Sequence, residues 1–258
     1  VRDVSQAFER QGFHVSNIIN PTSVDLRSEL RKFIVNHGLT KENRNNRLVI
    51  FYSGHGYTRG NGRGYLVPAD SPDPTIDESG FLDKAIDMIE IMSIARQIEA
   101  KHALFVFDSC FSGTLFKAKS KPNISSGYIR RSTGKPVRQF ITAGDEKQEV
   151  PAKSIFTPLF IRAIEGEADL NNDEYVTGVE LGLHLMQTVP KYNSSQTPLY
   201  GKIRDAVLDE GDFVFQLNSR EYTRVDDSNE KTKDDKYDVL GLNAGYLRNR
   251  ISGVTREF

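Results

Sequence analysis

Two short motifs carry the residue types of a thiol nucleophile and its base. Ser53-Gly54-His55-Gly56 places an imidazole between two glycines, and Asp108-Ser109-Cys110-Phe111-Ser112-Gly113 contains the one cysteine of the chain. A thiol becomes nucleophilic at neutral pH when a base or a cation lies beside it, and imidazole is the usual partner. Main-chain N–H groups of Gly56 and Cys110 could hold an oxyanion, at roughly 3 kcal/mol for each well-placed donor. The motifs therefore predict chemistry at a cysteine, with His55 as general base and acid.

Each residue alone also has an ordinary structural interpretation. A cysteine after an apolar strand is commonly an inert buried thiol, and a histidine in a glycine-rich turn commonly does no chemistry. The joint pattern favours a site, because His55 and Cys110 each follow a buried-type strand. Ligands of open α/β sheets bind at the carboxyl ends of parallel strands.

The elements that must position these motifs follow from apolar periodicity. Helices are expected at 1–11, 22–38, 86–100, 155–164 and 177–189, and strands at 13–19, 47–53, 64–69, 103–107, 137–143 and 213–217. Thr22 with Asp25 three residues later predicts a helix start of the capping-box kind. Strands that alternate with helices predict an α/β fold with a mostly parallel central sheet and helices on both faces.

The two motifs resemble the catalytic motifs of caspase-like cysteine peptidases, specifically the metacaspase and bacterial caspase-homologue branch. The resemblance extends over about residues 1–217 and implies a caspase-like three-layer sandwich with His55 and Cys110 as the catalytic dyad. The histidine lies roughly 50 residues before the cysteine, as in caspases, whereas their Gln-Ala-Cys signature is absent. The resemblance also implies a hydrophobic strand before the helix at 1–11. No such segment precedes Val1.

Asp108 stands two residues before the cysteine, where true caspases have glutamine. A carboxylate in the pocket for P1, the residue before the scissile bond, favours Arg or Lys by charge-assisted pairing. The alternative is that Asp108 only caps the following turn. Ser53 is a further candidate for substrate binding, and Asp145 and Glu146 are weaker ones. The predicted function is a cysteine endopeptidase that cleaves protein or peptide substrates after Arg or Lys and needs no cofactor for its chemistry.

By the same resemblance, the catalytic domain at 1–217 has three parts. These are a large-subunit-like part at 1–116, a basic processing loop at 117–136 and a small-subunit-like part at 137–217.

Two segments are expected to lie outside the sheet. Residues 115–138 contain seven basic residues and no acidic residue. The resemblance implies that the enzyme itself cuts this segment, so self-cleavage after a basic residue is expected at 117–121 or 130–138. An ordinary solvated basic loop is the alternative. Residues 218–258 include nine charged residues among the thirteen at 226–238, and predict a charged extension or linker.

Residues 169–180 resemble the Ca²⁺ loop of an EF-hand. The five ligand candidates are Asp169, Asn171, Asp173, the carbonyl of Tyr175 and Glu180. The sixth position departs from the pattern, because Glu174 replaces the usual glycine at a cost of about 1 kcal/mol or more for a positive φ. Bound Ca²⁺ and a purely structural turn are both compatible with the sequence.

The composition excludes several classes of protein. Lys and Arg number 34 against 35 Asp and Glu, so no basic excess predicts nucleic-acid binding. Apolar runs are only strand-sized, which predicts no membrane span. A single cysteine cannot form an internal disulfide and favours a reducing compartment, the cytoplasm. An activating partner or a tethered domain fits the prediction, and the rival is a catalytically silent caspase-like module for binding or calcium sensing.

Overall fold

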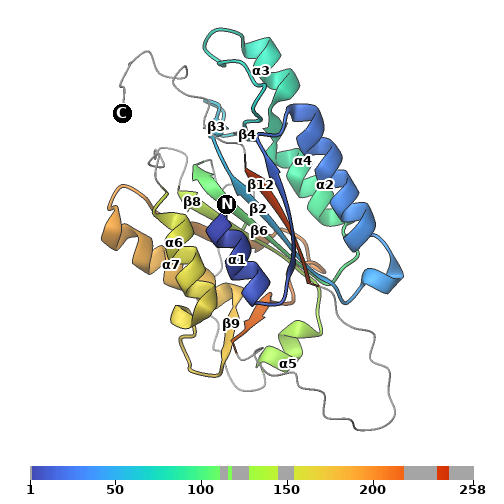
Figure 1. Ribbon diagram of the computed structural model, residues 1–258, viewed down its shortest axis with the longest axis vertical. Coiled ribbons are helices and arrows are strands. Elements are labelled where there is room, and N and C mark those ends of the chain that lie inside the picture. The colour runs from blue at the N-terminus through green and yellow to red at the C-terminus, as the bar shows by residue number, and fades with distance from the viewer. Residues whose placement is uncertain (1, 111–115, 118–127, 145–153, 218–236, 244–258) are drawn as a thin grey trace.

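The computed structural model of the protein describes residues 2–110, 116–117, 128–144, 154–217 and 237–243 (Figure 1). Within them a seven-stranded sheet has the order β1-β12-β2-β6-β8-β10-β7. Its strands are β1 (His14–Ile19), β2 (Arg47–Ser53), β6 (His102–Cys110), β7 (Phe116–Lys117), β8 (Val137–Gly144), β10 (Leu199–Ile203) and β12 (Tyr237–Asn243). The first five strands in the sheet order are parallel, and β10 is antiparallel to both of its neighbours. The mostly parallel sheet is confirmed.

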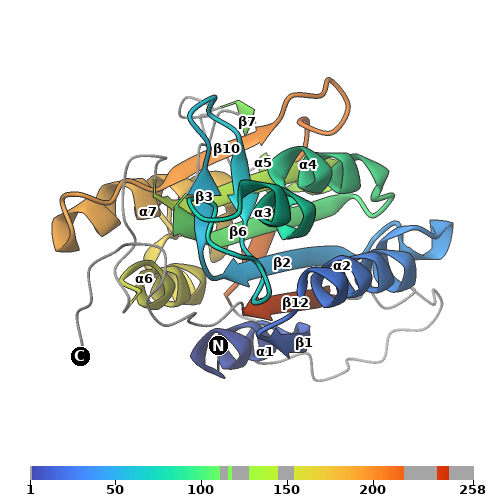
Figure 2. The same ribbon diagram turned by 90° about the horizontal axis from the view of Figure 1, so that it is seen from above.

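Helices cover both faces of this sheet (Figures 1 and 2). One face carries α1 (Arg2–Arg10), α6 (Phe156–Arg162) with its π-helical continuation η3 (Ala163–Glu167), and α7 (Gly178–Tyr192), and the other carries α2 (Ser23–Gly38) and α4 (Met88–Gln97). Successive strand residues point to opposite faces, so Val49 and Phe51 of β2 pack against the first group and Ile50 against the second. The three-layer sandwich is therefore confirmed.

Smaller elements lie at the two ends of the sheet. They are η1 (Lys41–Asn43), β3 (Gly56–Thr58), β4 (Gly64–Leu66), α3 (Glu78–Lys84), β5 (Ile86–Asp87), α5 (Tyr128–Thr133), β9 (Tyr175–Thr177) and β11 (Val214–Gln216). The sheet β3-β4-β5 and α3 lie beyond the end where β2 leads into His55, and α5 lies beyond the other end (Figure 1). Residues 213–217, predicted as a strand, contribute β11 to a separate pair with β9. None of the helices in the described ranges is both long and apolar enough to span a bilayer.

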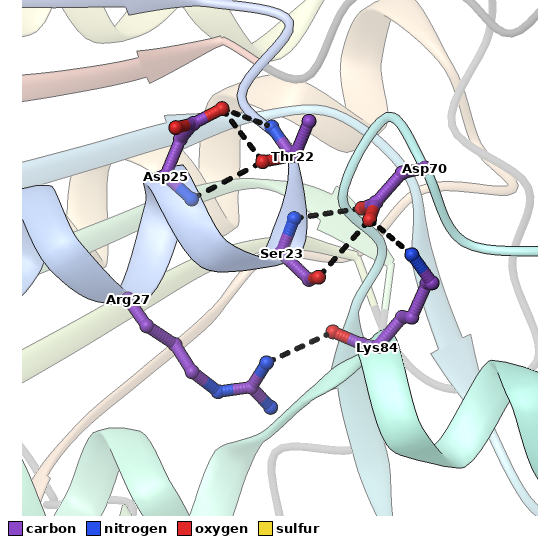
Figure 3. A network of polar contacts seen from close by, with 6 residues as sticks. All are labelled: Thr22, Ser23, Asp25, Arg27, Asp70 and Lys84. Carbon is purple, nitrogen blue, oxygen red and sulfur yellow. Dashed lines mark hydrogen bonds and ion pairs between the residues drawn. The ribbon is translucent and has the colours of Figure 1, made fainter.

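The start of α2 is tied to the segment that follows β4 (Figure 3). The predicted capping box of Thr22 and Asp25 is present. Asp70 accepts hydrogen bonds from the Ser23 N–H at 2.7 Å and from the Lys84 ammonium at 2.5 Å. Partial burial of Asp70 works against its ionisation, but Lys84 and Ser23 outweigh it and lower the pKa of the carboxyl. Arg27 adds a contact to the Lys84 carbonyl (Figure 3), so α2 and α3 are fixed to each other.

The strand β12 contradicts the prediction that residues 218–258 are only an extension or linker. It lies between β1 and β2 and is parallel to both. Val239, Leu240 and Leu242 are buried on the two faces of the sheet. In the sequence this short apolar alternation adjoins the strongly charged residues 226–238, so it did not indicate a strand. Residues 237–243 thus supply the strand that joins β1 to β2 in the sheet.

The second half of the predicted basic loop is also regular structure. Residues 128–133 form α5, and β8 begins at Val137. Arg138 is only 1% exposed and donates to the main-chain carbonyls of Ala95 at 2.8 Å and Lys101 at 3.0 Å, and to that of Ile98. Arg138 therefore satisfies carbonyls at the end of α4, which a helix leaves without internal partners. The loop prediction is wrong for 128–138.

Candidate active site

The two predicted motifs begin at the same end of neighbouring strands. Ser53 of β2 pairs in register with Asp108 of the parallel strand β6, and the Gly54 N–H donates to the Asp108 carbonyl at 3.4 Å. After an irregularity that follows Phe107, Cys110 pairs along the backbone with Gly144 of β8. The segments that carry His55 and Cys110 therefore leave the sheet side by side. The Cys110 side chain lies outside the part of the chain that the structure describes.

The main chain at His55 is fixed by a residue that the sequence did not single out. The hydroxyl of Tyr52 lies 2.8 Å from the His55 carbonyl and 3.1 Å from the Val67 carbonyl, and the Val67 N–H donates to the His55 carbonyl at 3.0 Å. Tyr52 is completely buried, and burial raises its pKa, so that its hydroxyl stays a proton donor. In the sequence Tyr52 looks like one more residue of an apolar strand, and no local signal marks this contact.

The His55 side chain is the predicted general base and acid. The residue is exposed, yet neighbouring protein atoms exclude enough water from the ring to lower its pKa below the ordinary value of 6.5. The ring is therefore mostly neutral at neutral pH, the state in which it accepts a proton. Gly56, the predicted oxyanion donor, is half-buried at the start of β3 and pairs with Leu66 of β4.

Asp108 is buried, with 4% of its surface exposed. Its Oδ2 accepts a hydrogen bond from the Thr157 hydroxyl at 2.6 Å, and the Thr157 N–H in turn donates to the Ser154 hydroxyl at 3.0 Å. Burial raises the pKa of Asp108, while the hydroxyls of Ser154 and Thr157 oppose that rise. The other carboxylate oxygen, Oδ1, is buried and has no hydrogen-bond partner among the described residues.

The remaining candidates for substrate binding differ in what the structure says of them. Ser53 is half-buried and lies between Asp108 and Asn243 of β12 in the sheet register. The backbone positions of Ser53 and Asp108 are thus neighbours at the carboxyl ends of the strands. Asp145 and Glu146 lie outside the described residues.

The EF-hand-like loop is closed by its own hydrogen bonds. The Asp173 N–H donates to Asp169 Oδ1 at 3.2 Å and to Asn171 Oδ1 at 2.9 Å, and the Tyr175 N–H donates to Asp173 Oδ1 at 3.0 Å. Glu174 has φ of 68°, so this residue does adopt the strained conformation that its position demands. Hydrogen bonds between the loop's own polar groups therefore hold this turn.

Glu180, the predicted twelfth ligand, belongs to the start of α7. Its Oε2 accepts from the Thr177 N–H at 3.0 Å and from the Thr177 hydroxyl at 2.8 Å, which completes a capping box. Burial raises the pKa of Glu180, and hydrogen bonds from Thr177 and Leu170 oppose the rise. In the described ranges, no three His, Cys, Asp or Glu side chains gather closely enough to hold a metal. Bound Ca²⁺ and a purely structural turn stay alternative predictions for this loop.

The fold and the placement of the motifs define a class: caspase-like α/β sandwiches, in which a histidine motif and a cysteine motif follow adjacent parallel strands. The family follows from a direct match. The model of the Caspase domain family matches residues 1–200, and the chain belongs to this family. No curated protein matches the chain. The sheet strand β12 lies outside the matched residues.

Proposed function

We propose that the protein is a cysteine endopeptidase that cleaves protein substrates after Arg or Lys. The observation that supports this best is the register pair of Ser53 with Asp108. It places the segments that contain His55 and Cys110 at the same end of neighbouring strands. Membership of the caspase family agrees with peptide-bond chemistry and with protein substrates.

The proposed reaction uses two residues and the main chain. His55 takes the thiol proton, and the Cys110 sulfur attacks the scissile carbonyl carbon to form a tetrahedral intermediate. The N–H groups of Gly56 and Cys110 stabilise its oxyanion. The intermediate collapses to a thioester as His55 returns the proton to the leaving amine. Water, deprotonated by His55, then hydrolyses the thioester and releases the thiol.

The proposed preference for a basic P1 residue depends on Asp108. Its carboxylate is buried at the strand end, and no described side chain supplies a cation to it. A guanidinium or ammonium group in the pocket would complete a charge-assisted pair. An acidic P1 side chain would instead place two like charges together in a site of low polarity, which is strongly unfavourable.

Fluorogenic peptides that differ only at P1 test this function. Peptides with Arg or Lys should be cleaved and the Asp peptide should not, and Cys110→Ala or His55→Ala should abolish turnover. His14→Ala, a substitution of an exposed histidine in β1, is the matched control and should retain activity. Equal turnover of the Asp peptide, or turnover by Cys110→Ala, contradicts the proposal. Failure of an Arg chloromethylketone to label Cys110 would support the silent binding module instead.

We also propose self-cleavage in the first half of the basic processing loop, at residues 117–121. Peptidases bind their substrates as extended strands, whereas Arg130 and Arg131 lie in α5 and Arg138 is buried in β8. Intact-mass measurements of the wild type and of Cys110→Ala should show fragments only in the wild type. The same fragments from Cys110→Ala would disprove self-cleavage.

A further inference from the structure

We infer that Thr157 is a positioning residue for the P1 pocket: its hydroxyl holds the Asp108 carboxylate in the orientation that receives a basic side chain. The inference rests on the proposed function and extends it to a residue 49 positions beyond Asp108. The contact joins β6 to the start of α6, on the other side of the basic segment. Thr157 would therefore couple the small-subunit-like part to substrate selection.

The geometry of the contact is that of a strong hydrogen bond. The Thr157 hydroxyl lies 2.6 Å from Asp108 Oδ2, within the 2.5–2.7 Å range typical of a hydroxyl that donates to a charged carboxylate. With Oδ2 engaged, the buried Oδ1 is the oxygen left for a ligand. In the proposed pocket, this second oxygen is the one that would pair with a substrate cation.

The hydroxyl is itself anchored. Ser154 accepts a hydrogen bond from the Thr157 N–H at 3.0 Å, which fixes the backbone at the start of α6. The neighbouring Phe156 and Phe160 are fully buried, and the Phe160 ring packs against Phe51 of β2 with their centroids 5.6 Å apart. Thr157 is therefore part of a helix whose apolar side chains pack against the sheet.

A neutral donor suits this task better than a charged one would. A lysine or arginine beside Asp108 would neutralise the carboxylate, and a basic substrate would then have to displace it. A hydroxyl orients the carboxylate and favours its charged form, but it leaves the negative charge for the substrate. The hydroxyls of Ser154 and Thr157 both favour the ionised form of Asp108, and neither of these side chains is cationic.

The test compares Thr157→Val, which removes the hydroxyl but keeps the shape, with Thr157→Ser, which keeps the hydroxyl. Both are made in the full chain and assayed with Arg and Lys peptides. Thr157→Val should raise KM about tenfold, the effect of losing roughly 1.4 kcal/mol of binding. The KM of this variant should also begin to rise at a higher pH than the wild-type KM does, because Asp108 then ionises less readily. Thr157→Ser should restore both quantities.

Two measurements separate positioning from damage to the fold. The rate at which iodoacetamide alkylates Cys110 does not depend on the P1 pocket and should equal the wild-type rate in both variants. Thr75→Val is a matched control, because it removes a hydroxyl that donates to Asp73 at 2.7 Å in an exposed loop. It should leave KM and the pH profile unchanged.

Three outcomes overturn the inference. The first is a wild-type KM and pH profile in Thr157→Val while Asp108→Asn loses cleavage after Arg, which removes Thr157 from the pocket. The second is a fall in kcat with slower alkylation and unchanged KM, which shows a general structural role. The third is a wild-type protein that cleaves no Arg peptide, which removes the proposed function and this inference with it.

Discussion

Buried groups fix the main chain of His55, the proposed catalytic base. The carbonyl of this residue accepts hydrogen bonds from the Tyr52 hydroxyl and the Val67 N–H, and the residue is exposed. A catalytic base works best when its supporting shell is rigid. The buried tyrosine would therefore support the proposed catalytic base through the main chain of His55.

The first prediction concerns the pH profile. Because the pKa of His55 is lowered below 6.5, the ring becomes protonated only when the pH falls below that value. With His55 as the proposed base, kcat/KM should decline as the pH falls from 8 to 5, with its acid midpoint under 6.5. Initial rates on an Arg peptide across this range measure it. A midpoint above 6.5 would be incompatible with a neutral His55 base.

At the scale of elements, the Arg138 side chain of β8 donates hydrogen bonds to carbonyls at the end of α4. The last carbonyls of a helix need donors, and a guanidinium offers five N–H groups in a fixed plane. Burial lowers the pKa of Arg138 to about 10, so the group still carries its charge at neutral pH. The main-chain carbonyl oxygens that accept hydrogen bonds from the guanidinium stabilise this positive charge.

The second prediction is that Arg138→Met destabilises the protein by about 2–4 kcal/mol, because several buried carbonyls lose their donors together. Arg138→Lys should recover little, since one ammonium cannot reach the same set of carbonyls. Arg130→Met, at an exposed position in α5, should change stability by less than about 0.5 kcal/mol. Urea unfolding of the three variants provides the measurement. Equal stability of Arg138→Met and the wild type would refute the capping role.

The third prediction concerns the loop at 169–180. Since its side chains close the turn and Glu180 caps α7, we expect calcium titration up to millimolar concentrations to give no saturable heat. Glu180→Ala should nevertheless destabilise the protein by about 1 kcal/mol or more, because the buried Thr177 N–H and hydroxyl lose their acceptor. Saturable heat that disappears in Asp169→Asn would show that the loop does bind calcium.

How far the sequence could predict this fold depended on whether the signal was local. The apolar run at 47–53 and the capping box at Thr22 are local patterns, and both appear as predicted. The contact of Arg138 with Ala95 spans 43 residues and that of Thr157 with Asp108 spans 49, so their neighbours in sequence say nothing of these roles. The same limit applied to β12, which is short and follows a strongly charged segment.

At the scale of the whole molecule, β12 (residues 237–243) pairs with β1 (residues 14–19), which lies more than 200 residues earlier in the chain. The Tyr237 ring packs on Phe13 with centroids 5.4 Å apart and lies 5.2 Å from the Arg47 guanidinium carbon. Asp238 is buried, with its Oδ2 3.0 Å from His37 Nδ1 of α2. These contacts surround a strand that is hydrogen-bonded on both sides. Its removal would leave β1 and β2 without their shared partner.

The fourth prediction is that a chain ending at Leu217, which spans the whole predicted catalytic domain, lacks a cooperative unfolding transition and peptidase activity. A chain ending at Asn243 keeps β12 and should retain both. Leu240→Ala probes the same strand without truncation: this buried residue should cost about 2–4 kcal/mol, whereas Leu170→Ala, 50% exposed, should cost little. Calorimetry and urea unfolding measure the differences. If the chain ending at Leu217 unfolds at the full-length midpoint, β12 is dispensable, and the sheet must close by direct pairing of β1 with β2.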